Sequence, residues 1–382
     1  MNKICIIISI IFYSFFQINN WKKPKYKKII IYDSEKSKFL TKYFNKNDFI
    51  IFSNRFDKFL RINFYVIIYL ILRLKLSFKN YKFFFLKFTC PEFIISGIDN
   101  NPGFYELKNN FPNVKIIMIQ FSYKFADFGI FEKKTLRKLI KNKKKYYIDH
   151  IFVFNKHFEK LFKKFILGNY HIIGSFFNNS SDYNFEIKNI NYGYISKGFY
   201  SSKNFNWKLF LRDEIKLLKN LSNYLFKKGK LLTVIGKNKN YKIEKSFYEK
   251  IIGKNKFYFI KSSNNPFDIY KTLSRVKVLL STDSTLQYEN LSRNCNTCIF
   301  AIRYKYHFSR RFGWPAFYRV SGKFWTNSFS LKEIDRVFSY ANKVKKNDLR
   351  KYLKKIGFFK NIMPYDKENK IFVKIAKKIE LI

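Results

Sequence analysis

Acidic residues are scarce in this chain. Only 26 Asp and Glu stand against 76 Lys and Arg, which leaves a formal net charge of +50 over 382 residues. Glycine (13) and proline (7) are also few, and this excludes a glycine- or proline-rich disordered chain. Hydrophobic residues make up 47% of the chain, enough for a sizeable core. The length predicts two domains of ordinary size.

Cysteine and histidine are rare, with four residues of each. Cys295-Asn-Thr-Cys298 has the spacing of a redox or metal pair, but no second pair and no nearby His accompany it, so we do not expect a zinc site. We interpret the cysteines as incidental thiols of a reduced, cytoplasmic chain. No Asp-x-Asp pair follows a predicted strand, and no Ser-His-Asp or Cys-His motif is present. We therefore expect neither a bound metal nor another cofactor.

The basic excess is carried mainly by Lys, and Asn, Ile, Phe and Tyr are abundant as well. All have A/T-rich codons, so genome composition accounts for part of the charge. A polyanionic partner remains open: nucleic acid, an anionic membrane or a phosphorylated substrate. The sequence has no zinc-finger spacing, no aromatic RNA-binding motif and no basic heptad segment, so we do not expect nucleic acid as a partner.

Two apolar runs bear on a membrane. Ile4 to Phe16 resembles a signal peptide, but no small-residue cleavage site follows it, and the run is too short to span a bilayer. We expect a buried first strand there. Phe64 to Leu72, bracketed by Arg61 and Arg73, predicts either a buried helix or a membrane-facing amphipathic one, and we favour the buried helix.

Short apolar runs alternate with longer amphipathic segments, which is typical of parallel α/β sheets. We expect an N-terminal Rossmann-like domain at residues 1–180 and a second at 181–365, with a polar linker near Asn178–Asp182. Residues 366–382 predict a C-terminal helix that could cross back to the first domain. The expected strands are Ile4–Ile8, Lys28–Tyr32, Phe49–Phe52, Phe93–Ser96, Lys115–Gln120, His150–Phe154, Tyr170–Ile173, Tyr192–Ile195, Lys230–Ile235, Lys256–Ile260, Val276–Leu280 and Thr297–Ile302.

The most informative stretch runs from Ser281 to Glu289, directly after the apolar run Val276–Leu280. Hydroxylated residues stand where a buried strand should turn into a helix. A helix N-terminus offers N–H groups and a positive dipole end, so this turn is a candidate anion site, with Glu289 placed to accept from sugar or ribose hydroxyls. A merely capped helix is the alternative. The residues expected to bind a nucleotide-sugar here are Ser281, Thr282, Asp283, Ser284, Thr285 and Glu289.

Other predicted strands end in polar residues too. Gly236 and Lys237 follow one strand as a short turn that could approach a phosphate, and Arg303 follows another, where a cation would face a diphosphate. Ligands of parallel sheets bind at these carboxyl ends. We therefore add all three residues to the expected donor site.

In the first half, Ser96-Gly97-Ile98-Asp99-Asn100-Asn101-Pro102 follows a strand and opens a helix. Asp99 would point into the cleft between the domains as a candidate base, or else belong to a capped turn. Asn100 and Asn101, with Gln120 and Ser122 after the next strand, are the expected acceptor-binding residues.

Several segments along the chain form one recognisable pattern: Ile98–Leu107, Phe111–Asn113, Ile119–Gln120, Ile173–Phe176, Ser281–Glu289, Phe312–Pro315 and Phe324–Asn327. Together they resemble a family, the surface-carbohydrate (O-antigen) biosynthesis proteins of bacteria. The resemblance implies a GT-B fold, in which two Rossmann-like domains face a cleft, and a glycosyltransferase activity. One departure is the bulky Phe121 after Gln120, where the family has a small polar pair.

The resulting hypothesis is a metal-independent glycosyltransferase of surface polysaccharide synthesis. It would move a sugar from a nucleotide-sugar to a glycan or lipid-linked acceptor, in the cytoplasm or at the inner membrane, whose anionic surface is a candidate partner. Two alternatives stay open. One is a nucleotide-sugar epimerase on the same scaffold, and the other is a non-catalytic basic protein that binds anionic membrane or nucleic acid.

Overall fold

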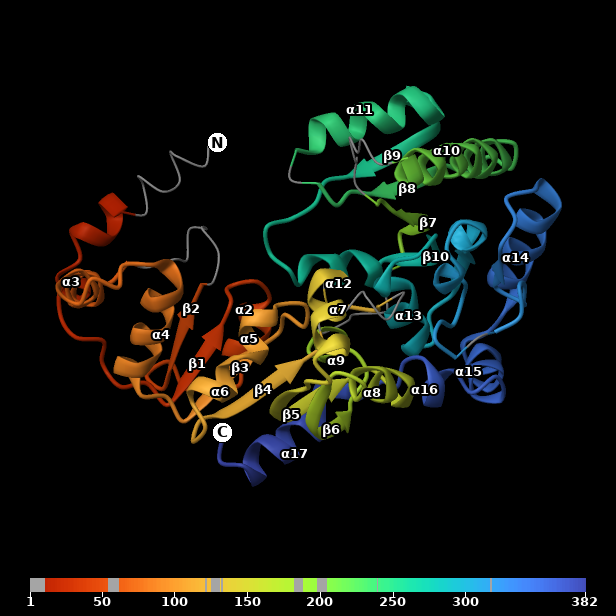
Figure 1. Cartoon of the computed structure of the whole chain (residues 1–382). Coiled ribbons are helices and arrows are strands. Elements are labelled where there is room, and N and C mark those ends of the chain that lie inside the picture. Colours follow the sequence, from red (N-terminus) through yellow and green to blue (C-terminus); the bar gives the residue numbers. More distant parts are fainter. Residues whose placement is uncertain are drawn as a thin grey trace.

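The computed structural model consists of two parallel α/β halves (Figure 1). It describes residues 11–53, 62–120, 122–124, 131, 133–181, 188–197, 205–238, 240–316 and 318–382. The first half contains β1 (Ile29–Tyr32), α2 (Ser37–Thr41), β2 (Phe49–Phe52), α3 (Phe64–Leu72), α4 (Phe78–Thr89), β3 (Phe93–Ser96), α5 (Pro102–Tyr105), α6 (Leu107–Asn110), β4 (Lys115–Ile119), α7 (Lys133–Lys141), β5 (Tyr146–Val153), α8 (Lys156–Phe162), β6 (Ile166–Ile172) and α9 (Phe176–Asn179).

The second half contains β7 (Ile190–Ile195), α10 (Phe205–Phe226), β8 (Leu232–Ile235), α11 (Tyr241–Ile252), β9 (Phe257–Ile260), α12 (Asp268–Ser274), β10 (Val276–Ser281), α13 (Thr285–Ser292), β11 (Thr297–Phe300), β12 (Trp325–Thr326) and α14 (Leu331–Lys343). The chain ends with α15 (Lys346–Lys355), α16 (Phe358–Asn361) and α17 (Lys370–Lys378).

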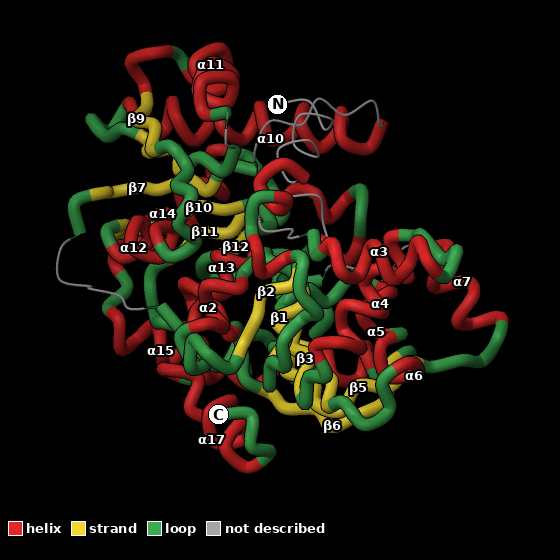
Figure 2. Tube along the Cα trace, turned by 90° about the vertical axis from the view of Figure 1, so that its left-hand side faces the viewer, coloured by secondary structure: helices red, strands yellow, loops and turns green. Residues whose placement is uncertain are grey.

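Each half is built on a six-stranded sheet. The strand orders are β2-β1-β3-β4-β5-β6 and β12-β11-β10-β7-β8-β9, and neighbouring strands pair in parallel. The prediction of two Rossmann-like parallel sheets in a GT-B arrangement is confirmed. Figure 2 shows the second sheet above the first.

Inner strands such as β1 and β3 are short apolar runs that are buried at every position, because both faces of the sheet are covered there. In β1, Ile30 and Tyr32 face a core shared with α3, α4 and α8, while Ile29 and Ile31 face a core shared with α2, α9 and α17. The C-terminal α17 thus packs against the first sheet, where Phe372 lies 5.1 Å from the ring of Phe152. The last helix therefore covers a face of the half in which the chain began.

Two local expectations change. The predicted strand Ile4–Ile8 lies outside the described residues. Residues 11–15 of the same apolar run form a helix whose apolar and aromatic side chains are exposed, so a buried strand is wrong for this part. The expected linker begins inside α9, where Asn178 and Asn179 are buried; Asp182 lies outside the described residues. Across the described parts of the chain, the helices are each too short or too polar to cross a bilayer.

The helix α3 is only partly buried. Val66 and Leu70 face the core, whereas Ile68, Ile71 and Leu72 are exposed. The sequence analysis favours burial of the whole run, whereas only one side of the helix is buried in the structure.

Candidate functional site

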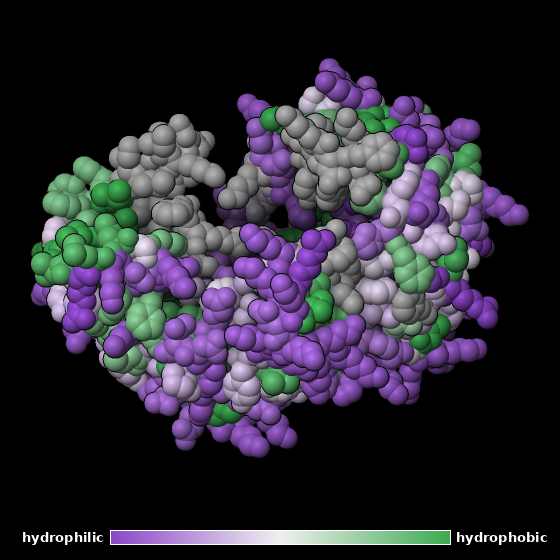
Figure 3. Space-filling model, in the orientation of Figure 1, coloured by the Kyte–Doolittle hydropathy of each residue, from purple (hydrophilic) through white to green (hydrophobic). Residues whose placement is uncertain are grey.

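In each sheet the order in which the chain adds strands reverses at one point, and a ligand is expected at these two switch points. In the second sheet, β7 lies between β10 and β8, so the chain leaves β7 in one direction and returns on its other side. In the first sheet, β1 lies between β2 and β3 in the same way. Open parallel sheets bind ligands outside the strand ends at such switch points. Figure 3 shows a hollow between the two halves.

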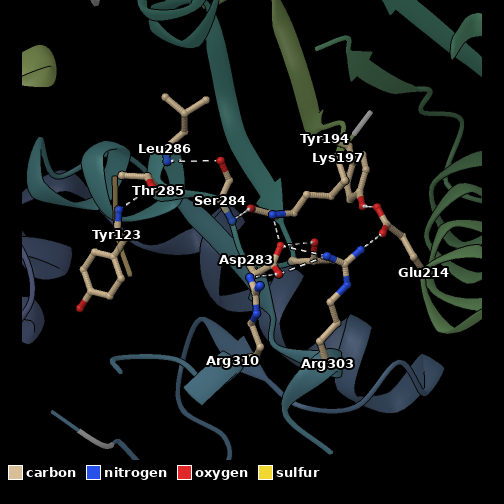
Figure 4. A network of polar contacts seen from close by, with 12 residues as sticks. Tyr123, Tyr194, Lys197, Glu214, Asp283, Ser284, Thr285, Leu286, Arg303 and Arg310 are labelled. Carbon is tan, nitrogen blue, oxygen red and sulfur yellow. Dashed lines mark hydrogen bonds and ion pairs between the residues drawn. The ribbon is translucent and has the colours of Figure 1, made fainter. Parts of the chain in front are cut away.

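A cluster of charges occupies the strand ends at the second switch point (Figure 4). Asp283, after β10, has a side chain that is 1% exposed and forms ion pairs with three cations. Lys197 comes from the end of β7, Arg303 from the end of β11 at 3.1 Å, and Arg310 from the loop beyond at 2.9 Å. Two strand ends and one loop thus bring three positive charges to the carboxylate that follows β10.

Arg303 has a second carboxylate partner. Its guanidinium joins Asp283 to Glu214 of α10, and the Tyr194 hydroxyl also donates to Glu214. Burial and the neighbouring Arg303 lower the pKa of Lys197. The side chain of Arg303 is 5% exposed, while that of Arg310 is 26% exposed. Arg303 is therefore the fixed centre of the cluster, and Arg310 is the cation that solvent reaches most easily.

The turn into α13 has the predicted capping geometry. Ser284 is the N-cap and accepts from the Leu286 N–H at 3.4 Å, while Ser281 accepts from the Ser284 N–H at 3.3 Å. Thr285 accepts from the backbone N–H of Tyr123, which belongs to the first half. Ser284 and Thr285 are half-buried, whereas Ser281 and Thr282 are buried. The open part of this expected site is therefore Ser284 and Thr285.

The body of α13 is held by the first half. Tyr288 stacks on Tyr123 with ring centroids 4.3 Å apart, and Ser292 accepts from Asn178 at 3.2 Å. Arg293, just after the helix, donates to the Asn178 side chain at 2.9 Å and to the Ser181 carbonyl at 3.0 Å. One helix thus carries the expected anion site at its start and an interface between the halves along its length.

Glu289, the expected ribose ligand, is buried within that interface. Ser175, the N-cap of α9, donates to one carboxylate oxygen at 2.5 Å, and the Tyr270 hydroxyl donates to the other at 3.2 Å. Burial raises the pKa of Glu289. Its oxygens point at partners from both halves, so a ribose would reach Glu289 only by displacing one of them.

The Gly236–Lys237 turn is occupied by the chain itself. Glu244 of α11 accepts from the backbone N–H groups of Lys237 at 3.1 Å and Asn238 at 2.9 Å, and from the Ser196 hydroxyl. A Cβ on Gly236 would lie 3.0 Å from Glu244 and 2.8 Å from Phe259. A buried carboxylate thus already accepts from the N–H groups that were expected to approach a phosphate, and a phosphate would have to displace Glu244 to reach them.

Asp99 also differs from expectation. Its side chain is fully buried and pairs with Lys124 at 2.8 Å, so it does not lie open to the cleft. Asn100 beside it is exposed, and Asn101 caps α5 by accepting from the Gly103 N–H at 3.1 Å. Action as a base would require Lys124 to move away.

Gln120 serves the backbone rather than a ligand. It is 1% exposed, accepts from the Phe154 N–H at 2.9 Å and donates to the Ser122 carbonyl at 3.0 Å. The expectation of an acceptor ligand is therefore not met by its geometry. Ser122 is half-buried and precedes Tyr123 at the contact with α13; Phe121, the departure from the family pattern, lies outside the described residues.

Sequence reasoning missed Lys197, Glu214 and Ser175. Lys197 stands two residues after β7, so the rule that identified Arg303 could have found it. Glu214 and Ser175 act through partners 89 and 114 residues away. No local pattern marks Glu214, and the segment Ile173–Phe176 contains Ser175 without indicating its contact with Glu289. Within the described ranges, no group of three or more His, Cys, Asp or Glu could hold a metal ion, and Cys295 and Cys298 are free thiols.

Two parallel sheets that meet at their switch points, with a basic cluster and a helix N-terminus between them, define a protein of the GT-B fold. The chain belongs to the family described as "putative O-antigen biosynthesis protein", whose model matches residues 130–380. No curated protein matches the sequence.

Solved structures share the fold at low identity. A "putative UDP-N-acetylglucosamine 2-epimerase" from Listeria monocytogenes is 10% identical with a TM-score of 0.54, covering 93% of this chain and 97% of its own. MnaA of S. aureus in complex with UDP is 12% identical with a TM-score of 0.53, covering 94% and 98%. The wall teichoic acid polymerase TagF is 13% identical with a TM-score of 0.53, covering 96% and 90%.

Proposed function

We propose that this protein is a glycosyltransferase of surface polysaccharide synthesis. It moves a sugar from a nucleotide-sugar donor to a glycan or lipid-linked acceptor on the cytoplasmic side of the membrane. Membership of the O-antigen biosynthesis family supports the pathway, and the fold supports the two-substrate geometry. The S. aureus structure that shares this fold holds UDP, which supports a nucleotide at the same scaffold.

The observation that carries the proposal is the cluster of Lys197, Arg303 and Arg310 at the second switch point. When the bond between the sugar and the diphosphate breaks, negative charge develops on the leaving diphosphate. A low-dielectric site stabilises that charge with cations and helix dipoles placed in advance. Three cations around Asp283, with the N-terminus of α13 beside them, supply both, and no metal is needed in this scheme.

The cations divide into two roles. Arg303 lies between Asp283 and Glu214 and is nearly inaccessible, so we assign it to positioning. Arg310 and Lys197 are more exposed and are the groups that turn toward the diphosphate. Ser284 and Thr285 add hydroxyl donors, and Glu289 receives the ribose once Ser175 releases it.

The first half supplies the acceptor side. Asp99 is the candidate base, provided that acceptor binding draws Lys124 away from it. Exposed Asn100, with Asn101 beside it and Ser122 after the next strand, β4, then binds the acceptor. The arrangement puts the base and the leaving-group cations on opposite halves, as a displacement at the sugar carbon requires.

A thermal-shift screen against UDP, GDP, CDP, CMP and their sugars tests the proposal. We expect one nucleoside diphosphate to raise the melting temperature. Arg310→Ala should weaken its binding by about 10- to 100-fold, because it removes one charged hydrogen-bond donor to phosphate. Arg350→Ala, which truncates an exposed arginine on α15, is the matched control and should bind normally.

Two results would count against the proposal. If no nucleotide binds the wild-type protein, the donor site does not exist. If the protein isomerises UDP-N-acetylglucosamine without an acceptor, as followed by NMR, the chain is an epimerase instead of a transferase.

A further inference from the structure

An apolar surface lies at the outer end of the first half, away from the donor site. It joins the helical residues 11–15, the outer face of α3 and the loop that follows α3. Leu72 is 79% exposed, Leu74 94% and Phe16 68%. We call it the α3 patch, and its members are Ile11, Phe12, Phe15, Phe16, Ile18, Ile68, Ile71, Leu72, Leu74 and Leu76. Figure 3 shows a hydrophobic area over α3.

Specific contacts hold the elements of the α3 patch together. Trp21 stacks on Phe64 of α3 with centroids 4.6 Å apart, and Phe15 contacts both rings. The Ser14 hydroxyl accepts from the Ile62 N–H at 3.1 Å, and Asn63 donates to the Lys22 carbonyl at 3.0 Å. These contacts hold the N-terminal segment and α3 side by side.

The helix α3 is apolar on both faces. Val66 and Leu70 are buried against α4 and the sheet, yet Ile68, Ile71 and Leu72 on the other side are exposed as well. A helix at a water-facing surface normally has a polar outer face, and contiguous exposed apolar area marks a contact with a partner or a membrane.

Charge identifies the partner. Residues 11–32 and 62–91 contain ten Lys and Arg and no Asp or Glu. Six of these cations are exposed next to the patch in sequence: Lys22, Lys23, Lys25, Arg73, Lys75 and Lys79. A second copy of the chain would bring like charges together, whereas an anionic lipid surface complements both the cations and the apolar side chains.

We propose that the α3 patch docks this protein on an anionic lipid bilayer, with its apolar side chains at the headgroup boundary and the flanking lysines and arginine on the headgroups. The docking rests on the proposed function in one respect: its biological role would be to bring the acceptor side of the molecule to a lipid-linked acceptor. Lipid binding itself requires no donor and no catalysis.

Flotation of the full-length protein tests the docking. The probe is phosphatidylcholine vesicles with about a third phosphatidylglycerol, against pure phosphatidylcholine. We expect binding to the anionic vesicles only. Leu72→Ser with Leu74→Ser should lower it by about tenfold or more, since two exposed apolar side chains no longer enter the interface. Phe226→Ser with Leu331→Ser, which removes two exposed apolar residues from the second half, should bind like wild type.

The contribution of the patch lysines to vesicle binding is tested separately, because the whole chain is strongly basic. Lys75→Gln should weaken binding by about fivefold, while Lys254→Gln, an exposed lysine of the second half, should not. At about 1 M salt exposed charges are screened. When protein is first bound to anionic vesicles and the salt is then raised, the vesicles should retain wild type better than the double variant at Leu72 and Leu74.

Three outcomes would overturn the docking proposal: equal loss in the patch and control variants, no anionic binding at all, or a wild-type dimer that the Leu72, Leu74 substitutions dissociate in sedimentation equilibrium. The last would assign the patch to a second copy. Nucleotide binding, measured in parallel, separates the two proposals: vesicle binding without nucleotide binding leaves the docking intact and refutes the transferase.

Discussion

Substitution of Arg303 by Met tests the charge cluster most directly. Met keeps most of the volume and removes the guanidinium between Asp283 and Glu214, whose side chains are 1% and 5% exposed. Asp283 retains Lys197 and Arg310, whereas Glu214 retains the Tyr194 hydroxyl and loses its cation. The loss of one partner of a buried ion pair costs about 3–5 kcal/mol, and we expect this destabilisation at pH 8.

The pH dependence gives this prediction its sign. A buried carboxylate without a cation takes up a proton more readily in the folded state than in the unfolded state. The stability of Arg303→Met should therefore fall as the pH rises, and its deficit relative to wild type should shrink from pH 8 to pH 5. Adding Glu214→Gln should recover about 1–3 kcal/mol, because the uncompensated charge is gone.

Urea unfolding followed by circular dichroism measures all three variants. The reasoning is refuted if Arg303→Met lies within about 1 kcal/mol of wild type at pH 8, or if its deficit is the same at both pH values. Either result would mean that water reaches Glu214 and that the cluster is not the low-dielectric site that the proposed chemistry needs.

Three further predictions are independent of this one. Burial raises the pKa of Glu289, so the folded state holds its proton more tightly than the unfolded state. Wild type should therefore lose stability relative to Glu289→Gln as the pH rises above 4.5, which urea unfolding at pH 4.5 and 7 measures. An equal difference in stability at both pH values would contradict this. Gly236→Ala places a Cβ 2.8 Å from Phe259 and should cost about 1–3 kcal/mol in the same assay, and an unchanged midpoint would show that the turn yields. Burial raises the pKa of Cys298, while Cys90 is exposed, so a thiol reagent should label Cys90 before Cys298 in peptide mass spectra of native protein. Rapid labelling of Cys298 would contradict its burial.

The sequence predicts those parts of the site that depend on local order. The apolar run Val276–Leu280 followed by Ser, Thr and Asp predicts a strand, a turn and a capped helix, and the structure has all three. The position of Arg303 at a strand end follows from the same alternation. Lys197 also follows the end of a strand, so the same rule could have identified it.

The rest depends on partners that are distant in the sequence. Glu244 fills the Gly236 turn, and Ser175 holds Glu289 from the opposite half. Composition alone also misplaced the outer face of α3, because an apolar run does not say which of its sides meets the core. Hydrophobicity predicts that a segment avoids water, and only the tertiary structure decides whether protein or another medium provides the cover.

The return of the chain to its first half restricts how the two halves move. The chain crosses after Ser181 and crosses back between α14, which packs on the second sheet, and α17, which packs on the first. Two connections restrict the relative motion of the halves more than one would, so we expect opening to be a rotation about the line that joins them. The contacts of Tyr288 and Arg293 with the first half would have to break in such an opening. The return is complete before α17, because α16 already packs on α8 and Asn155 donates to the Ile362 carbonyl. Truncation before α16 would therefore leave the halves joined by the first connection alone.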